Sequence, residues 1–325
     1  MGINNFRKSS VNIKDTLIQI KNSRVFLVIV GLFLLSLLLS VLSPHFLTVS
    51  NILNVLKQIS MIAVVSIGMT YVIITGGIDL SVGSVLALSA VSAAYLMTHN
   101  INMYLAITVG MIIGVVCGFI SGILITTKIN MPPFIATMAM MGIGRGLSMV
   151  ITEGRPIYGL PNQFGFIAGG YVFGIPMPVI IMIFLYLIGY VHLSYVRTGM
   201  YYYAIGGNQE ATRVAGIDIR RVKLSAYVIS GLTASIAGII LASRLVSIEP
   251  LSGSGYELDA IAAAVIGGAN LYGGEGSIIG TLVGAIIMGV LRNGLNLLNV
   301  SAYWQQVAVG IVIAGVVSIN ALRKK

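Results

Sequence analysis

Long apolar runs recur along the whole chain and leave few places for charged side chains. The chain has 325 residues, of which 57% are hydrophobic and 9% are charged. Soluble domains carry about 25% charged residues, so this sequence cannot cover its surface with groups that water solvates. Because about 20 residues of apolar helix cross the hydrocarbon core of a bilayer, the runs predict a protein that spans a membrane several times.

The runs divide the chain without any long linker, so we expect one transmembrane domain over residues 1–325. The expected fold is an all-α polytopic membrane protein of about ten transmembrane helices, some of them short or broken. The candidate spans are residues 25–42, 54–75, 81–97, 103–127, 132–151, 176–195, 223–245, 258–271, 276–298 and 303–322.

Basic residues lie in the short segments between these spans and account for the net charge of +10. They are not gathered on one soluble domain, so the charge indicates membrane topology and contact with lipid, and no nucleic-acid partner. The positive-inside rule places segments 1–24 and 196–222 in the cytoplasm. The basic C-terminal end is also cytoplasmic if segment 258–271 crosses the membrane, and its short length leaves a re-entrant path open.

A short sequence echo connects two distant spans. "MGIGRGL", Met141 to Leu147, resembles "MGVLRNGL", Met288 to Leu295, with one residue inserted, and both copies keep an arginine. Transporter folds are often built from internal repeats, so the echo is compatible with two related halves.

The first unusual span contains a carboxylate between two apolar runs, in "TYVIITGGIDLSVGSVLAL" from Thr70. A charge at the bilayer centre costs about 2.5–3.5 kcal/mol on insertion scales, so such a residue normally faces a cavity or a partner. We expect Asp79 to hold a helix break by accepting hydrogen bonds from backbone N–H groups, with Ser81 and Ser84 beside it. A broken helix is also a pointer to a substrate pathway.

The second unusual span, Gly253 to Ala285, has two carboxylates near its start and Gly-Gly pairs that interrupt it. Each carboxylate alone is more simply explained by a helix cap or by pairing with Arg145, Arg244 or Arg292. The two unusual spans together predict the walls of a translocation pathway, with weak hydrogen bonds to the cargo. The candidate pathway residues are Asp79, Ser81, Ser84, Tyr256, Glu257, Asp259 and Asn270.

The segment "GGNQEATRVAGIDIRRVK", Gly206 to Lys223, lies on the predicted inside face. Asn208 can cap a short helix whose first turn carries Glu210, which the helix dipole favours. Such a helix, with small residues and flanking glycines, suits docking into a groove on a partner, although an ordinary cytoplasmic loop is the simpler interpretation.

Several kinds of chemistry find no support in the sequence. No Gly-Lys pair is present, so the chain cannot bind ATP through a P-loop. The three histidines are scattered, and the single cysteine lies in an apolar run, which gives no metal or triad spacing. We therefore expect no catalytic site, no metal and no cofactor.

Four long motifs resemble the permease subunits of bacterial ribose/galactoside-type ABC sugar importers. They are "TGGIDLSVGS", "PFIATMAMMGIGRG", "AIGGNQEATRVAGI" and "GSGYELDAIAAAVIGGANLYGGEGSIIGTLVGA". The resemblance covers about residues 44 to 320. It implies a bacterial inner-membrane protein that carries a monosaccharide, ribose or a similar sugar, and that works as a pair of permeases with a separate ATPase subunit and a periplasmic sugar-binding protein.

The same resemblance assigns the inside segment to coupling with the ATPase. The residues that match the coupling motif are Gly207, Asn208, Glu210, Ala211, Arg213 and Gly216. Thr212 departs from the alanine that is usual at its position in the motif.

Two alternatives remain at this point. One is an ion-coupled secondary transporter in which Asp79, Glu257 or Asp259 carries the coupling charge. The other keeps the ABC mechanism and changes the cargo to an amino acid, a nucleoside or a sugar-like signal.

Overall fold

The structure, a computed structural model, describes residues 24–322. The predicted cytoplasmic segment 1–24, apart from its last residue, and the basic C-terminal end lie outside the described residues. Within the described part, six helices are long and apolar enough to cross a membrane by themselves. They are α3 (Val49–Ile74), α5 (Met103–Thr126), α6 (Pro133–Thr152), α8 (Met177–Tyr195), α11 (Ile219–Leu245) and α13 (Ile278–Leu297).

Further apolar helices complete the predicted set, so the expectation of an all-α polytopic membrane protein is confirmed. They are α2 (Arg24–Leu42), α4 (Val82–Thr98), α12 (Tyr256–Ile266) and α14 (Ala302–Leu322). The remaining elements are short: η1 (Asn162–Gly165), α7 (Phe166–Gly169), β1 (Tyr171–Val172), β2 (Ile175–Pro176), α9 (Arg197–Gly207) and α10 (Gln209–Val214).

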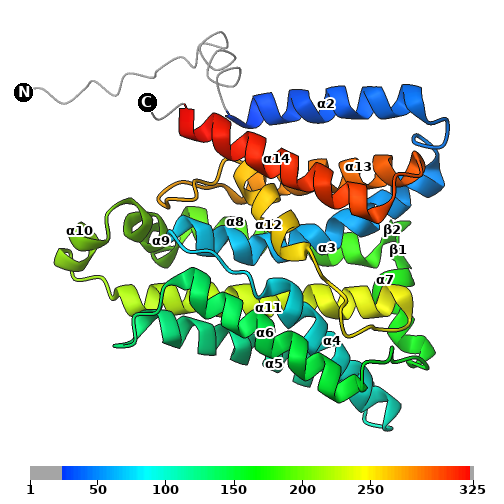
Figure 1. The fold of residues 1–325 in the computed structure, drawn as a ribbon, viewed down its shortest axis with the longest axis horizontal. Helices are drawn as coiled ribbons and strands as arrows, with labels where there is room; N and C mark the ends of the chain where they lie inside the picture. Colours follow the sequence, from blue (N-terminus) through cyan, green and yellow to red (C-terminus); the bar gives the residue numbers. More distant parts are fainter. Residues whose placement is uncertain (1–23, 323–325) are drawn as a thin grey trace, which may run out of the picture.

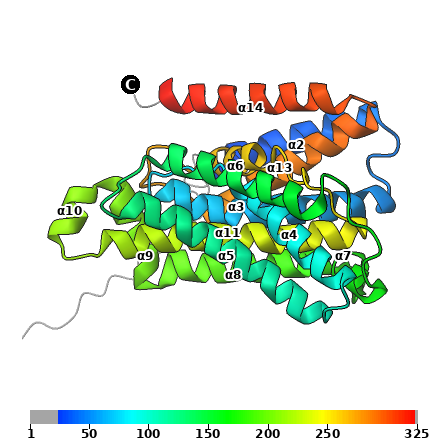
Figure 2. The same cartoon turned by 60° about the horizontal axis from the view of Figure 1, so that its bottom comes forward.

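The long helices run side by side along the long axis of the molecule (Figure 1). Helices α3 and α11 form the centre, and α3 is buried almost continuously from residue 59 to residue 74. Helices α9 and α10 lie at one end, and α7 with the β1–β2 hairpin lies at the other. Helix α14 lies at the edge of the bundle (Figure 2). The start of α2 and the end of α14 lie at the same end as α9 and α10 (Figure 1).

Two predicted span boundaries are wrong because a span can begin before its apolar run does. Helix α3 begins at Val49, not at residue 54, and Thr48 caps it by accepting a hydrogen bond from the Asn51 N–H. Helix α11 begins at Ile219, not at residue 223, and Asp218 caps it through the Arg221 N–H. The caps satisfy backbone donors, and the basic side chains in the first turn of α11 can keep their charges at the membrane surface.

The predicted span 258–271 is also too long, because α12 ends at Ile266. Gly267 follows directly, and Gly268 has a φ of +95°, which an L side chain rarely adopts. The chain then forms an irregular loop, residues 267–277, before α13.

The loop 152–175 is structured, since it contains η1, α7 and the β1–β2 hairpin. Ser243 of α11 anchors it: its hydroxyl donates to the Phe164 carbonyl at 2.6 Å and accepts from the Ala168 N–H at 3.0 Å. Phe173, at the hairpin tip, is fully exposed.

Candidate functional site

Two stretches of the chain cross the bundle as an irregular segment followed by a short helix. Residues 75–81 join α3 to α4, and residues 246–255 join α11 to α12. In Figure 1, α4 and α12 both begin near the middle of the long axis and run toward opposite ends. Such discontinuous helices are the arrangement that the sequence predicts for the two unusual spans.

The second stretch extends from one end of the bundle to the other when the loop after α12 is included (Figure 1). At one end, Ile248 pairs with Ile157 of the loop 152–175. At the other end, the Gly274 N–H donates to the carbonyl of Ile74, at the end of α3, at 2.9 Å. The irregular segment, α12 and the loop after it together extend along the bundle, although α12 alone has only 11 residues.

The first turns of α4 and α12 meet at Gly83. A Cβ atom at this position would collide with both the Glu257 Oε2 and the Gly253 carbonyl oxygen, so only glycine permits the contact. Helix N-termini carry about half a positive elementary charge each. The Glu257 carboxylate therefore lies where two such termini can stabilise its negative charge.

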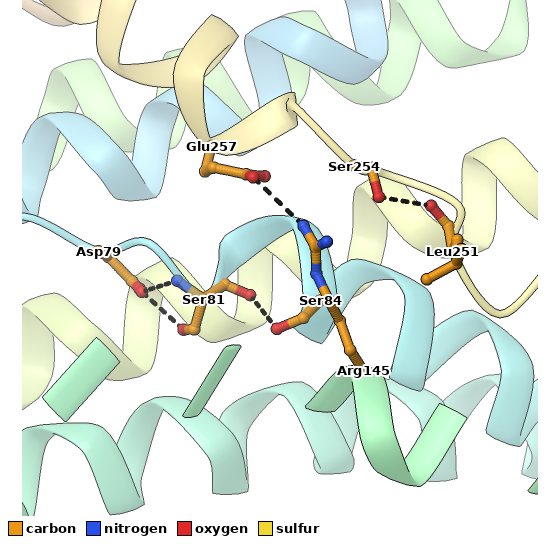
Figure 3. Close-up of polar contacts among 7 residues, drawn as sticks. All are labelled: Asp79, Ser81, Ser84, Arg145, Leu251, Ser254 and Glu257. Carbon is orange, nitrogen blue, oxygen red and sulfur yellow. Dashed lines mark hydrogen bonds and ion pairs between the residues drawn. The ribbon is translucent and has the colours of Figure 1, made fainter. Parts of the chain in front are cut away.

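Glu257 also forms an ion pair with α6 (Figure 3). The distance from Arg145 Nη2 to Glu257 Oε1 is 3.3 Å, and the two side chains are 33% and 12% exposed. One predicted alternative, a carboxylate paired with Arg145, is thus confirmed for Glu257. The pair joins α6 to the junction of the two short helices.

Asp79 is buried in the irregular segment before α4. Its Oδ1 accepts from the Ser81 N–H at 2.9 Å and from the Ser81 hydroxyl at 2.6 Å (Figure 3). Its Oδ2 accepts from the Ser230 hydroxyl of α11 at 2.7 Å. The predicted role in holding the helix break is confirmed, while the contact with Ser230 was not foreseen, because nothing in the apolar α11 sequence distinguishes one serine from another.

Asp259 lies on another face of α12 and pairs with Arg292 of α13. Arg292 Nη2 is 2.8 Å from Oδ1 and 2.7 Å from Oδ2, and the aspartate side chain is 1% exposed. Both arginines of the sequence echo, Arg145 and Arg292, therefore meet carboxylates of α12. Arg244, the third predicted partner, lines the same pocket as Asp259.

The other predicted pathway residues do not gather in one place. Ser84 donates to the Ser81 carbonyl within the first turn of α4, and both are buried. Tyr256 faces the pocket beside Asp259. Asn270 lies in the loop 267–277, where its side chain accepts from the Tyr272 N–H. It therefore shapes the end of the crossing and does not join the carboxylates at mid-depth.

Segment 196–222, which the sequence predicts as the coupling loop, contains α9 and α10 at one end of the bundle (Figure 1). The Asn208 side chain caps α10 by accepting from the Ala211 N–H at 2.9 Å, as predicted. Glu210 and Arg213 form an exposed ion pair at 3.3 Å. Val214 is 88% exposed. An apolar side chain held outward on a short capped helix is a feature that suits docking.

Two further predicted coupling residues, Gly207 and Gly216, lie on either side of α10. Gly207 ends α9, and Gly216 has a φ of +79° in the turn after α10. A groove of about 550 Å³ lies between the end of α5 and this turn, and its lining includes Gln209, Arg213, Arg220 and Lys223.

A close backbone contact connects α9 with both irregular crossings. A Cβ atom at Gly206 would collide with the Ile74 carbonyl oxygen and with the Gly274 nitrogen. The Tyr203 hydroxyl adds a hydrogen bond to the Gly276 carbonyl at 3.1 Å. The sequence does not predict this contact, because Gly206 belongs to a Gly-Gly pair of which either member could be the buried one.

Comparison with known proteins agrees with this architecture. The family described as the permease component of branched-chain amino acid transport systems matches residues 51–317. The chain belongs to this permease family. It is therefore a multi-pass membrane protein and a transport component, not an enzyme.

Similar proteins extend over most of the chain. The ribose import permease RbsC of Bacillus subtilis is 49% identical over 87% of this chain and 88% of its own length. The ribose import permease RbsC of Escherichia coli K12 is 45% identical over 88% and 90%. The D-allose permease AlsC of the same strain is 37% identical over 90% and 91%. No solved structure matches the chain.

Proposed function

We propose that this protein is the permease subunit of a binding-protein-dependent ABC importer that carries a monosaccharide, ribose or a similar sugar, across the bacterial inner membrane. The observation that carries the proposal is the junction of α4 and α12 at Gly83 and Glu257. Relatives named for ribose and D-allose support the cargo class.

The junction suits a gated pathway. Irregular backbone at membrane depth is tolerated only where protein buries it or where it lines a water-filled cavity. Separating the two first turns would expose the backbone of residues 75–81 and 246–255 to such a cavity. Discontinuous helices of this kind surround the substrate in other transporters, which supports a pathway along Asp79, Ser81, Ser84 and the first turn of α12.

ATP hydrolysis in a separate subunit supplies the energy in this proposal. The exposed α10 is the docking element, through Glu210, Ala211, Arg213 and Val214. Movement of α10 passes to α9, and the Gly206 contact passes it on to the end of α3 and to the loop 267–277. One displacement at the surface therefore reaches both irregular crossings.

The opposite end of the molecule faces the periplasm in this proposal. The α7 and β1–β2 segment, with Phe173 at its tip, is the docking surface for the sugar-binding protein. Both termini are then cytoplasmic, because the start of α2 and the end of α14 lie at the same end of the molecule as α9 and α10 (Figure 1). A second copy of the permease completes the membrane-embedded core, and lipid surrounds it.

The contacts of the three carboxylates disfavour an ion-coupled transporter. Glu257 and Asp259 are paired with arginines, and Asp79 accepts three hydrogen bonds. A coupling carboxylate has to bind and release an ion or proton in each cycle, which these partners oppose. An amino acid, a nucleoside or a sugar-like signal keeps the same mechanism with another cargo.

Reconstitution separates these possibilities. Proteoliposomes that contain the permease, its ATPase and its sugar-binding protein should accumulate D-ribose only when ATP is present. Proteoliposomes with the permease alone should show no uptake under a proton or sodium gradient. Gradient-driven uptake by the permease alone would overturn the proposal, and uptake of only another cargo by the complete system would correct the cargo.

A further inference from the structure

The groove of about 550 Å³ beside α10 is lined by three parts of the chain. They are the end of α5 with its connection to α6, the helix α10, and the first turn of α11 with the turn before it. The charged residues of this lining are Arg213, Asp218, Arg220 and Lys223. Docking of the exposed side of α10 to an ATPase does not explain why a basic hollow lies between α10 and α5.

Two of the charged residues in the lining already have partners of opposite charge. Arg213 is paired with Glu210 of the same helix at 3.3 Å. Asp218 is paired with Arg221 at 3.0 Å, and Arg221 does not line the groove. These two residues therefore contribute little net charge to the groove.

Arg220 and Lys223 are the unbalanced charges of the groove. No ion pair within residues 24–322 includes either of them. They are three positions apart at the start of α11, so the two side chains lie on the same side of the helix. Lys223 Nζ donates one hydrogen bond to Gln209 Oε1 of α10 at 2.8 Å, which leaves two of its N–H donors for a ligand. Two neighbouring cations with N–H donors favour an oxyanion such as a phosphate.

The surroundings of the groove favour a lipid phosphate over a soluble one. Thr126 and Thr127, which line the groove, lie at the end of α5, a helix long and apolar enough to span the membrane. Beside them, Lys128 is exposed, and Ile129 is 60% exposed. Phe134, in the first turn of α6, is 52% exposed. A basic hollow beside exposed apolar side chains at the end of a membrane span can hold a headgroup while the acyl chains remain in the bilayer.

We propose that this groove binds the headgroup of an anionic phospholipid, with the lipid phosphate at Arg220 and Lys223. The inference rests on the orientation in the proposed function, which places this end of the molecule at the cytoplasmic leaflet, where basic segments attract anionic lipid. It goes beyond general contact with lipid, because one headgroup has a defined site. Lys223 also contacts Gln209, so a bound headgroup connects the membrane surface to the docking helix α10.

Native mass spectrometry of the full-length permease tests the site in the absence of the ATPase and of sugar. The protein is delipidated in detergent and titrated with phosphatidylglycerol. Phosphatidylcholine is the zwitterionic comparison, and inorganic phosphate is the soluble anion. We expect one phosphatidylglycerol to bind more tightly than phosphatidylcholine by about tenfold or more, because two cations near an anionic lipid each contribute to its binding. Excess phosphate should not displace the lipid.

Two groove variants and one matched control locate the bound lipid. Arg220→Gln and Lys223→Gln should each weaken phosphatidylglycerol binding about fivefold, the contribution of one basic side chain near an anionic surface. Arg197→Gln removes an exposed arginine at the same end of the molecule that does not line the groove, and it should leave the affinity unchanged. Thermal unfolding of the three variants shows whether each protein remains folded.

Several results would overturn the inference. Equal affinity for the two lipids would remove the anionic headgroup site, and displacement by phosphate would make the groove a site for a soluble anion. An equal loss of affinity in Arg197→Gln would mean that the charge of the whole surface attracts lipid. Unchanged lipid binding in both groove variants, with loss of ATPase co-purification, would assign the groove to an acidic segment of the ATPase.

A parallel measurement keeps this inference separate from the proposed function. ATP-dependent uptake of D-ribose is measured for the complete importer in the same preparations. Uptake without a preference for phosphatidylglycerol refutes the headgroup site alone. Selective binding of phosphatidylglycerol without uptake refutes the proposed function alone.

Discussion

Glu257 of α12 contacts Arg145 of α6 with one carboxylate oxygen, at 3.3 Å, and lies against the backbone of Gly83 in α4 with the other. The two residues of the ion pair are 112 positions apart in the chain. One carboxylate therefore holds together three helices at the point where two short helices begin. The charge of Glu257 has two stabilising partners, the guanidinium and the helix N-termini, and these can be separated by mutation.

Exchanging the charges of Arg145 and Glu257 should not give a protein as stable as the wild type. Glu257→Gln should lower the thermal unfolding midpoint in detergent, because a hydrogen bond to a charged group contributes about 1.5–3 kcal/mol. The double variant Arg145→Glu/Glu257→Arg should be less stable than Glu257→Gln, since it places a cation at two positive helix ends. Recovery of wild-type stability by the double variant would show that the ion pair alone matters.

Asp79 should tolerate the loss of charge better than the loss of its oxygen atoms. Asp79→Asn keeps one oxygen for the two Ser81 donors, and its NH₂ group can donate to a reoriented Ser230 hydroxyl. Asp79→Ala leaves the buried Ser81 N–H without a partner, which costs about 1–3 kcal/mol. We expect near-normal unfolding temperature and transport for the asparagine variant and a clear loss for alanine.

Comparing unfolding with transport for Asp79→Asn also distinguishes a structural role of Asp79 from a role of its charge in the pathway. Normal unfolding with complete loss of transport would mean that the charge itself is needed in the pathway. Ser230→Ala tests the contact between Asp79 and α11 separately. It removes the Ser230 hydroxyl that donates to Asp79 and leaves the Ser81 contacts in place.

Gly206→Ala should impair the coupling of transport to ATP hydrolysis more than Gly207→Ala, although the two residues are adjacent. A Cβ at Gly206 would collide with backbone atoms of Ile74 and Gly274, whereas a Cβ at Gly207 meets nothing within 4 Å. Gly206→Ala should therefore displace α9 and lower sugar uptake per ATP hydrolysed in the reconstituted importer. Equal uptake-to-ATP ratios for the two variants would refute the proposed transmission from α9 to the irregular crossings.

Glu210→Lys tests whether α10 docks to the ATPase. Its side chain is 73% exposed, so reversal of the charge should leave membrane insertion and folding intact. It should reduce co-purification of the ATPase and the ATPase activity stimulated by the permease. Glu249→Lys is the matched control, since Glu249 is also exposed and lies near the other end of the molecule. Unaltered co-purification with Glu210→Lys would remove α10 from the docking surface.

The observed helix boundaries show which parts of each helix the apolar pattern can predict. The interior of each apolar run was predictable, because hydrocarbon offers no hydrogen bonds and the backbone has to satisfy its own groups as helix. The starts of α3 and α11 were misplaced, because Thr48 and Asp218 cap these helices before the hydropathy rises. A cap acts through one hydrogen bond, which average hydropathy does not register.

The amino-acid sequence by itself determined the class of protein, the two interrupted crossings and the local cap at Asp79. These follow from forces that act within about one helix length: exclusion of water by lipid, glycine backbone freedom and hydrogen bonding over a few residues. Only the tertiary structure decided that Glu257 meets Arg145 and Gly83, that Gly206 is the buried glycine, and that Asp259 faces a pocket. Helical periodicity shows which residues share a face, but the neighbour of that face is chosen by packing between segments far apart in the chain.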